Sequence, residues 1–462
     1  MITARAFSGK HYAVLGLARS GLATVDALLA SGAKVTAWDG NAAARAKVLE
    51  KPLPFRGGVG VGQSSAAPGT PELSLVAGPT PTPPLKGRGL ELADPLEIDL
   101  TGFAAVVVSP GVPLNKHPIA AYAKSFGVPV IGDIELFAQA RPDLPSHKVV
   151  GITGTNGKST TTALIHHIIE TAGIPTLMGG NIGLPIMGRD PLPEGGIYVL
   201  ELSSYQIDLT FSLDCDVAVL TNITPDHLDR YDGFAGYAAS KERLFAMQSA
   251  GHAAIIAVED EPSRAIAGRI PDVIAVRSSE VGDQSAWPAL QGPHNAQNAV
   301  IAIAVARALG IAEDAIARGL ATYTSLPHRM QRIAEKNGVL FVNDSKATNA
   351  TATAPALAAY PAVHWILGGL PKSDDLDDCA SHFDHVRAAY TIGQAGPMFA
   401  TILRAAGKPV TESGTLAQAV KDAAAAAKPG EVVMLSPACA SFDQFSDYEA
   451  RGDAFRASVE AL

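Results

Sequence analysis

The sequence is poor in cysteine and has no long apolar run. Its 462 residues include three cysteines, Cys215, Cys379 and Cys439, which are odd in number and far apart. This spacing excludes a disulfide framework and a Cys-x-x-Cys metal or redox site, so we expect reduced thiols in a cytoplasmic protein. No apolar stretch reaches the roughly 18 residues of a membrane span, and the N-terminus lacks the pattern of a signal peptide. We therefore expect neither a membrane partner nor secretion.

Clustered positive charge is also missing. The formal net charge is -9 at pH 7, and lysine and arginine nowhere form a block. A nucleic-acid surface leaves a basic footprint, so nucleic acid is excluded as a partner and small molecules are favoured. Nothing in the sequence indicates an oligomer, and a monomer is expected.

What is present is the pattern of an α/β protein. Short apolar runs end in Gly, Asp or Asn and are followed by helical patterns along the whole chain, which is typical of parallel sheets with crossover helices. The runs that predict strands are residues 12–15, 34–38, 104–108, 128–131, 148–152, 197–202, 217–221, 253–258, 339–342, 363–367, 389–392 and 431–435. Helices are predicted at 295–309 and 417–427.

The length predicts more than one core. A chain of 462 residues is expected to form several domains, and three fit the clustering of the strands. We place them at 1–146, 147–326 and 327–462. Residues 61–89, rich in Pro, Gly, Ser and Thr, are predicted to be a long mobile surface insertion.

The sharpest motif is a phosphate-binding loop. A predicted strand leads into a glycine-rich turn, then a lysine and a hydroxyl at the start of a helix predicted from Thr160. In this order a loop can hold phosphates on backbone amides, the lysine can reach the terminal phosphates and the hydroxyl can meet magnesium. The residues are Gly154, Thr155, Asn156, Gly157, Lys158, Ser159 and Thr160. The strict pattern fails only at Ile152, which replaces its first glycine. ATP is the expected nucleotide.

Two further groups of residues are open to more than one interpretation. The turn from Gly16 to Gly21 has Ala18 where close approach of a pyrophosphate favours glycine, so a structural turn and a ligand site, with Asp39 on a ribose or base, are equally compatible. Glu201 and His227 follow strands at the edge where parallel sheets bind ligands. They are candidates for a divalent-ion site, although a lone loop histidine is more often structural.

Five segments together resemble the Mur ligases, which build the peptide stem of peptidoglycan precursors. The segments are Gly154–Ser159, Gly179–Gly183, Glu201–Gln206, Asp226–Arg230 and Asn343–Asn349. They occur in the family's order and span most of the chain. Two more segments, 132–137 and 435–445, resemble the members of the family that add D-glutamate.

The resemblance implies a UDP-binding domain, an ATPase domain and a C-terminal domain of dinucleotide-binding type. It also implies that ATP and two Mg²⁺ ions drive the joining of D-glutamate to UDP-N-acetylmuramoyl-L-alanine through an acyl phosphate. Lys158, His227, Lys241 and Arg329 would be catalytic, with Lys241 carbamylated. Without the resemblance, Lys241 reads as a solvated helix residue.

The resemblance also assigns binding roles. The implied metal ligands are Ser159, Thr160, Glu201, His227 and Lys241. Asn295, Arg329 and Asp344 would contact the nucleotide together with the phosphate loop. The implied substrate contacts are Arg19, Ser20, Asp39, Ser109, Asn181 and His227 for the UDP-linked substrate, and Lys346, Thr348, Lys372, Ser441, Phe442 and Tyr448 for glutamate.

Three departures from the family pattern affect these assignments. Asn41 replaces an arginine expected near UDP, Tyr448 stands where phenylalanine is common, and Lys372 has different preceding residues.

Three alternatives stay open at this point. The ligase could add L-glutamate or another amino acid, because the sequence cannot show the chirality of a pocket. A nicotinamide-dependent oxidoreductase using the first domain is disfavoured by Ala18 and by the complete ATP site. A non-catalytic nucleotide sensor is disfavoured by the presence of Lys158, Glu201, His227 and Lys241.

Overall fold

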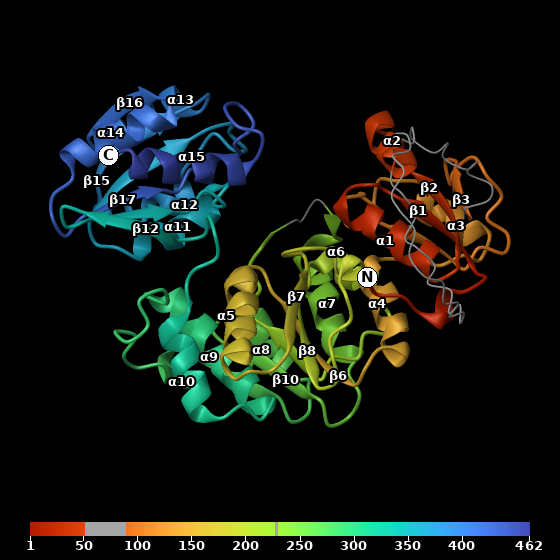
Figure 1. Ribbon diagram of the computed structural model, residues 1–462. Helices are drawn as coiled ribbons and strands as arrows, with labels where there is room; N and C mark the ends of the chain where they lie inside the picture. The colour runs from red at the N-terminus through yellow and green to blue at the C-terminus, as the bar shows by residue number, and fades with distance from the viewer. Residues whose placement is uncertain (51–88, 227–229) are drawn as a thin grey trace, which may run out of the picture. The chain divides into compact units, whose positions relative to one another are not determined.

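The chain folds into three sheets with helices between the strands, and a computed structural model describes residues 1–50, 89–226 and 230–462 (Figure 1). The chain divides into two compact units, one of Met1–Thr162 with Gly173–Ala275 and one of Ala163–Ala172 with Val276–Leu462. The α/β class is confirmed, whereas the three domain boundaries stay predictions. The predicted insertion at 61–89, apart from Gly89, and His227 lie outside the described residues.

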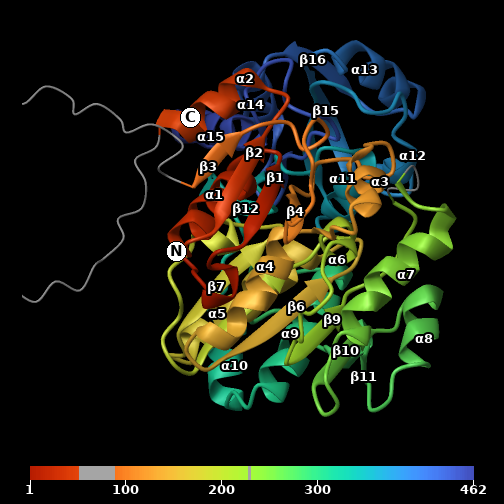
Figure 2. The same cartoon turned by 90° about the vertical axis from the view of Figure 1, so that its right-hand side faces the viewer.

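The first sheet has the strand order β3-β2-β1-β4-β5. Its strands are β1 His11–Leu15, β2 Lys34–Trp38, β3 Leu90–Leu92, β4 Ala105–Val108 and β5 Val130–Ile131. Its helices are α1 Arg19–Ala30, α2 Ala42–Glu50, α3 Ile119–Ser125 and α4 Asp133–Ala140. Alternate residues of β1 pack on opposite faces, Tyr12 and Val14 in the core that includes α1 and α4, and Ala13 and Leu15 in the core that includes α3. Figure 2 shows β3, β2, β1 and β4 side by side in this order.

The second sheet has the order β11-β10-β9-β6-β8-β7. Its strands are β6 His147–Thr153, β7 Thr176–Gly180, β8 Gly196–Glu201, β9 Val217–Leu220, β10 Ala253–Ala257 and β11 Ile274–Val276. Between and after them lie α5 Lys158–Thr171, α6 Ser204–Asp208, α7 Gly233–Ala246, α8 Glu261–Ala267, α9 Pro293–Ala308 and α10 Glu313–Thr322. Strands β6 to β10 pair in parallel, so their carboxyl ends meet at one edge. Sequence analysis missed β7 and β11.

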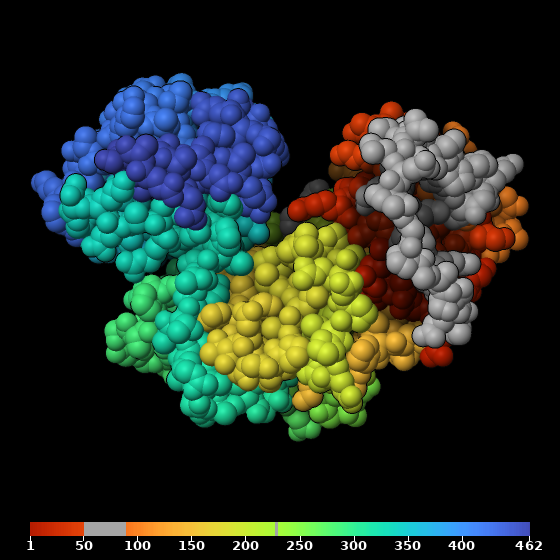
Figure 3. Space-filling model, viewed as in Figure 1, coloured from red at the N-terminus to blue at the C-terminus, as the bar shows by residue number. Residues whose placement is uncertain are grey.

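The third sheet has the order β12-β13-β17-β14-β15-β16. Its strands are β12 Gln331–Lys336, β13 Val339–Asn343, β14 Val363–Gly368, β15 Val386–Ile392, β16 Val410–Gly414 and β17 Val432–Leu435. Its helices are α11 Ala350–Ala358, α12 Asp377–Ala380, α13 Gly396–Ala405, α14 Leu416–Ala426 and α15 Tyr448–Glu460. Residues of α11 and α13 pack in one core, and residues of α14 and α15 in the other. α14 and α15 therefore cover one face of the sheet, and α15 forms dark blue surface in Figure 3.

At one edge of this third sheet the pairing is an exception to the parallel pattern that the sequence predicts. Strand β12 pairs with β13 in antiparallel fashion, and the two are joined by Asn337 and Gly338 with φ of 52° and 75°. Positive φ at both residues is what a tight type I′ hairpin turn requires, and an Asn-Gly pair supplies it at little cost. The Asn-Gly signal was available in the sequence.

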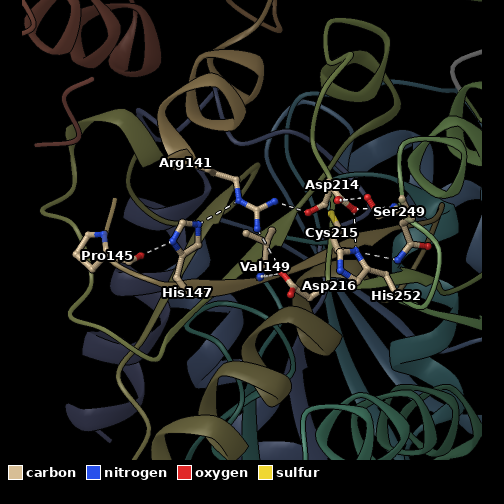
Figure 4. Close-up of polar contacts among 10 residues, drawn as sticks. Arg141, Pro145, His147, Val149, Asp214, Cys215, Asp216, Ser249 and His252 are labelled. Atoms are coloured by element: carbon tan, nitrogen blue, oxygen red, sulfur yellow. Dashed lines mark hydrogen bonds and ion pairs between the residues drawn. The ribbon is translucent and has the colours of Figure 1, made fainter. Parts of the chain in front are cut away.

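A polar network holds the start of the second sheet (Figure 4). The Nε–H of Arg141 donates to Nε2 of His147 over 3.1 Å, so this imidazole nitrogen is the acceptor and the other, Nδ1, donates to the carbonyl of Pro145 over 2.7 Å. Arg141 also contacts the carbonyl of Asp214 and the carboxylate of Asp216. Burial, together with the Arg141 charge, lowers the pKa of His147 from its usual value near 6.5. The network therefore requires a neutral His147.

Acidification is expected to destabilise the protein through this histidine. Because the folded-state pKa lies below the unfolded-state pKa, the unfolded chain binds the proton first, and stability falls as the pH drops below about 6.5. His147→Gln keeps an acceptor for Arg141 but does not titrate, so its melting temperature should fall less than that of the wild type between about pH 7.5 and pH 5.5. His117→Gln, outside the network, is the control. Equal acid sensitivity of His147→Gln and the wild type would contradict the assignment.

Among the described residues, no helix combines the length and the apolar character needed to cross a bilayer.

Candidate active site

The predicted phosphate loop forms a glycine-dependent turn at the carboxyl end of β6. Gly154 has φ 144°, and a Cβ there would lie 1.9 Å from Oγ1 of Thr221, so only glycine fits. The amides of Thr155 and Asn156 donate to the carbonyl and side chain of Asn222 over 2.8 and 2.9 Å. The end of β9 therefore holds the loop in shape.

The helix after this loop begins at Lys158, two residues before the predicted start at Thr160. Ser159 is buried and Thr160 partly buried in its first turn, and the first amides of a helix point outward as anion donors. Gly157 has φ 80°, so it also uses a conformation that favours glycine. This local geometry is what phosphate binding needs.

Two lysines converge on one carbonyl of the loop. The Nζ atoms of Lys158 and Lys241 donate to the carbonyl of Gly154 over 3.0 and 2.8 Å. Lys241 comes from α7, is 1% exposed and has its Nζ 4.4 Å from the ring centre of Tyr237. Burial, helped by the Lys158 charge, lowers the pKa of Lys241 to about 6. Lys241 is therefore a neutral amine at neutral pH, and its interpretation as a solvated residue is wrong.

Glu201 is the last residue of β8, and only one of its two carboxylate oxygens has a hydrogen-bond partner. Its Oε1 accepts from Nδ2 of Asn181 over 2.9 Å, and its backbone carbonyl accepts from the amide of Asn181 over 2.8 Å. Oε2 is buried and has no hydrogen-bond partner. A buried carboxylate oxygen without a donor is costly unless a cation fills the position, so Glu201 fits a metal ligand.

The rest of the predicted metal set is only partly described. His227 lies outside the described residues. In the described part of the chain, no group of three or more His, Cys, Asp or Glu side chains is arranged to hold a metal ion.

The first βα turn is held by Asp39 and Ser109. Asp39 accepts from the amides of Leu17 and Asn41 over 2.7 and 2.8 Å, and Ser109 Oγ donates to the carbonyl of Gly16 over 2.9 Å. Both predicted substrate residues thus have structural partners as well. Arg19 is exposed and Ser20 partly buried at the start of α1, beside this turn.

Sequence analysis missed a cation near this turn. The guanidinium of Arg45 in α2 lies 4.3 Å over the ring of Trp38 and donates to the carbonyl of Asp39. It follows Asn41, the position that departs from the family pattern, by about one helical turn. The sequence does not show that Arg45 contacts Asp39; the contact is visible only in the folded structure.

In the second unit, Asn295 lies in the first turn of α9 and is 8% exposed. Its Nδ2 donates to the carbonyl of Gln291 and its Oδ1 accepts from Asn298. Each of these atoms has one further hydrogen-bonding position, so Asn295 can still bind an adenine edge.

Arg329 lies in a strained turn next to Asp344. Its neighbours His328 and Met330 have φ of 60° and 47°, which for residues with side chains costs about 1–3 kcal/mol each. The carboxylate of Asp344 accepts from the amide of Met330 and from the hydroxyl of Ser436. Burial raises the pKa of Asp344 to about 6, although Ser436 and Arg329 oppose the shift. This turn therefore places the Arg329 charge close enough to act on Asp344.

The predicted glutamate residues come from three loops at the carboxyl edge of the third sheet. Nζ of Lys372 donates to Oγ1 of Thr348 over 3.1 Å, and Nζ of Lys346 lies 5.6 Å from the ring centre of Tyr448. Ser441 is 2% exposed. Phe442, the predicted aromatic wall, is 69% exposed, so its role stays a prediction.

A buried arginine that sequence analysis missed ties these loops together. Arg451 of α15 is fully buried, and burial lowers its pKa to about 10. Its guanidinium donates to Oγ and the carbonyl of Ser345 and to the carbonyls of Cys439 and Ala440, over 2.9 to 3.1 Å. One side chain thus fixes the loop before Lys346 to the loop before Ser441.

Two family profiles match the chain. The Mur ligase middle domain matches residues 152–285, which include the phosphate loop, Glu201 and Lys241. The profile described as Mur ligase, glutamate ligase domain matches residues 328–439, which include Arg329 and Asp344. The chain belongs to the Mur ligase family.

Full-length relatives narrow the comparison. The protein named UDP-N-acetylmuramoylalanine--D-glutamate ligase from Novosphingobium aromaticivorans is 62% identical to this chain, over all of this chain and 97% of that protein. The protein of the same name from Zymomonas mobilis is 60% identical over the full length of both proteins. The protein of the same name from Caulobacter vibrioides is 42% identical over all of this chain and 98% of its own length.

Solved structures support the fold. UDP-N-acetylmuramate-alanine ligase MurC from Thermotoga maritima matches with TM-score 0.57 and 15% identity over 98% of this chain and 99% of that one. MurF from Acinetobacter baumannii matches with TM-score 0.53 and 19% identity over 70% of this chain and 78% of that one. At such low identity the likeness concerns the fold alone.

Proposed function

We propose that the chain is a cytoplasmic, ATP-dependent ligase that joins D-glutamate to UDP-N-acetylmuramoyl-L-alanine in peptidoglycan precursor synthesis. The observation that carries the proposal is the 62% identity, over the whole chain, to a relative named for this reaction. The glycine-dependent phosphate loop and the two lysines on Gly154 agree with it.

The first step brings two anions together. The alanine carboxylate attacks the γ-phosphorus of ATP, the bond to ADP breaks, and an acyl phosphate forms. Two unit charges about 4 Å apart repel by about 4 kcal/mol at an effective dielectric near 20, so cations must offset the repulsion. We assign this role to Lys158 and to Arg329, whose presentation is fixed by the strained turn.

The second step forms the amide. The amine of D-glutamate attacks the acyl carbon, loses a proton, and phosphate leaves as the carbon–oxygen bond breaks. Lys346, Thr348, Lys372 and Ser441 are assigned to the glutamate carboxylates, with Phe442 and Tyr448 beside its chain. Arg19, Ser20, Asp39, Ser109 and Asn181 are assigned to the UDP-linked substrate, and Asn295 and Asp344 to the nucleotide.

We propose that two magnesium ions take part. When bound, Mg²⁺ would neutralise phosphate charge. Glu201, with its open Oε2, would hold one ion together with Ser159 or Thr160, and His227 would lie beside the second. The neutral amine of Lys241 can add carbon dioxide and release a proton, which forms a carbamate anion and supplies a further oxygen ligand.

Phosphate release tests the proposal. Purified protein with ATP, Mg²⁺ and UDP-N-acetylmuramoyl-L-alanine is assayed with D-glutamate, with L-glutamate and with neither. Release that depends on D-glutamate supports the proposal. Release only with L-glutamate would keep the mechanism and overturn the amino acid, and release with neither would overturn the function.

Glu201→Gln is expected to lower the ligation rate by about 100-fold and to raise the Mg²⁺ concentration needed, because an amide is a weaker ligand than a carboxylate. Initial rates against Mg²⁺ concentration measure this effect. Glu194→Gln, an exposed change shortly before β8, is the control. An unchanged Mg²⁺ dependence in Glu201→Gln would show that Glu201 does not bind the ion.

A further inference from the structure

A water-sized cavity lies beside the turn between β1 and α1. Its volume of about 10 Å³ is close to the room that one water needs. The lining residues are Val14 of β1, Ser20, Gly21 and Thr24 of α1, Val107 to Pro110 at the end of β4, and Asp133 of α4. The cavity therefore joins the start of α1 to the ends of β1 and β4.

Asp133 brings an unsatisfied charge to this cavity. The residue is 5% exposed, and its Oδ1 is buried without a hydrogen-bond partner. It is the only charged side chain among the lining residues. Since a buried carboxylate oxygen without a donor is costly, a donor in the cavity is required, and one water fits.

The other wall of the cavity is the tightly packed start of α1. A Cβ at Gly21 would lie 1.8 Å from the carbonyl of Gly16, and that carbonyl accepts from Oγ of Ser109. The helix has 12 residues, and its first-turn amides and dipole favour an anion at this end. Any shift of Ser20 or Ser109 would move the turn itself.

We propose that Asp133 is a positioning residue of the nucleotide-substrate site. Through one water in this cavity Asp133 orients Ser20 and Ser109, and Asp133 takes up a proton when a diphosphate diester binds at the start of α1. The inference rests on the proposed function, in which Ser20 and Ser109 contact the UDP-linked substrate.

The direction of the proton movement follows from charge. Burial raises the pKa of Asp133 to about 6, and a bound anion nearby raises it further, so binding near neutral pH draws a proton from solvent. Charged residues on the elements packed around Asp133 point elsewhere or reach solvent. Glu135 accepts hydrogen bonds from the amides of Phe211 and Ser212, and Arg5 binds Asp143. On α1, Arg19 is exposed, and Asp26 lies about 200° around the helix from Thr24, which lines the cavity.

Calorimetric binding of UDP-N-acetylmuramoyl-L-alanine, without ATP or glutamate, tests the inference. Titrations in buffers of different ionisation enthalpy count the protons taken up. For the wild type we expect proton uptake and an affinity that rises about three- to tenfold from about pH 8 to about pH 6. Asp133→Asn should bind without uptake and with an affinity independent of pH. Asp26→Asn, an acid of α1 outside the cavity, should behave as the wild type.

The outcomes separate the two claims. Uptake that persists in Asp133→Asn, or binding by the wild type without uptake, would overturn the inference and leave the proposed function standing. A wild type that does not bind this nucleotide would overturn both. If Asp133→Asn does not fold, carboxyl carbon NMR decides. Asp133 and Asp344 are both buried with a pKa near 6, so the signal that remains in Asp344→Asn must be the one that shifts upward with nucleotide.

Discussion

Replacing Lys241 with methionine is expected to abolish ligation while making the protein more stable. Loss of the amine removes the carbamate ligand, and removing one such preorganised group costs on the order of 100- to 1,000-fold in rate. Stability should rise because Lys241 must lose its proton to be buried, and an apolar side chain of similar size does not carry this cost; replacing a buried ionisable group in this way is often stabilising by about 1–4 kcal/mol. Loss of the hydrogen bond to the carbonyl of Gly154 reduces this stabilisation by about 1 kcal/mol.

The pH dependence of stability shows whether the gain in Lys241→Met comes from the shifted pKa of Lys241 or from changed packing. The pKa of Lys241 is about 6 in the folded protein and near 10.5 in the unfolded chain, so the unfolded chain binds the extra proton between these values. Wild-type stability should therefore rise with pH across this window, and the advantage of Lys241→Met should shrink as pH rises. Thermal melts in carbon-dioxide-free buffer measure it, with the exposed Lys148→Met as control. A variant that keeps a tenth of the activity, or melts in parallel with the wild type, contradicts the assignment.

Replacing Arg451 with methionine is expected to cost about 3–5 kcal/mol of stability and to weaken the site for the amino acid. Four hydrogen bonds to buried acceptors on Ser345, Cys439 and Ala440 would be lost at once, and of these acceptors the carbonyl of Ala440 keeps a second donor, the amide of Leu370. Arg451→Lys should recover little, because an ammonium cannot reproduce the planar fork.

The expected kinetic signature is selective. The KM for D-glutamate should rise several-fold more than the KM for ATP, since the loops before Lys346 and Ser441 lose their common anchor. Arg456→Met, a change on the same helix at a partly exposed position, is the control. Equal changes in both KM values would show that Arg451 supports the whole unit and not these loops in particular.

The phosphate loop could be predicted because its information is local. Gly154, Gly157 and Lys158 stand in one short segment directly after an apolar run, and the backbone at the two glycines has a positive φ that favours glycine. Each strand predicted from such a run is present, with its ends shifted by a few residues. Strand β16, by contrast, has no buried residues, so it has no apolar pattern to detect.

Residues that act through distant contacts could not be predicted in this way. The burial of Lys241 depends on which side of α7 packs against the loop after β6, and nothing near Lys241 in the sequence shows it. Arg451 looks like any arginine of a polar helix, because its acceptors lie up to 106 residues away. The family resemblance supplied Lys241 but not Arg451 or Arg45.

The strand order of the third sheet sets a sequence of events during protein synthesis. The β12–β13 hairpin has the shortest connection in this sheet and can form within microseconds of leaving the ribosome. Strand β17, near the end of the chain, must then enter between β13 and β14, which both pair with β17 and not with each other. The nascent C-terminal sheet therefore stays split into two parts until Val432–Leu435 has been made. A chain cut short before this strand is expected to expose two unpaired sheet edges and to aggregate.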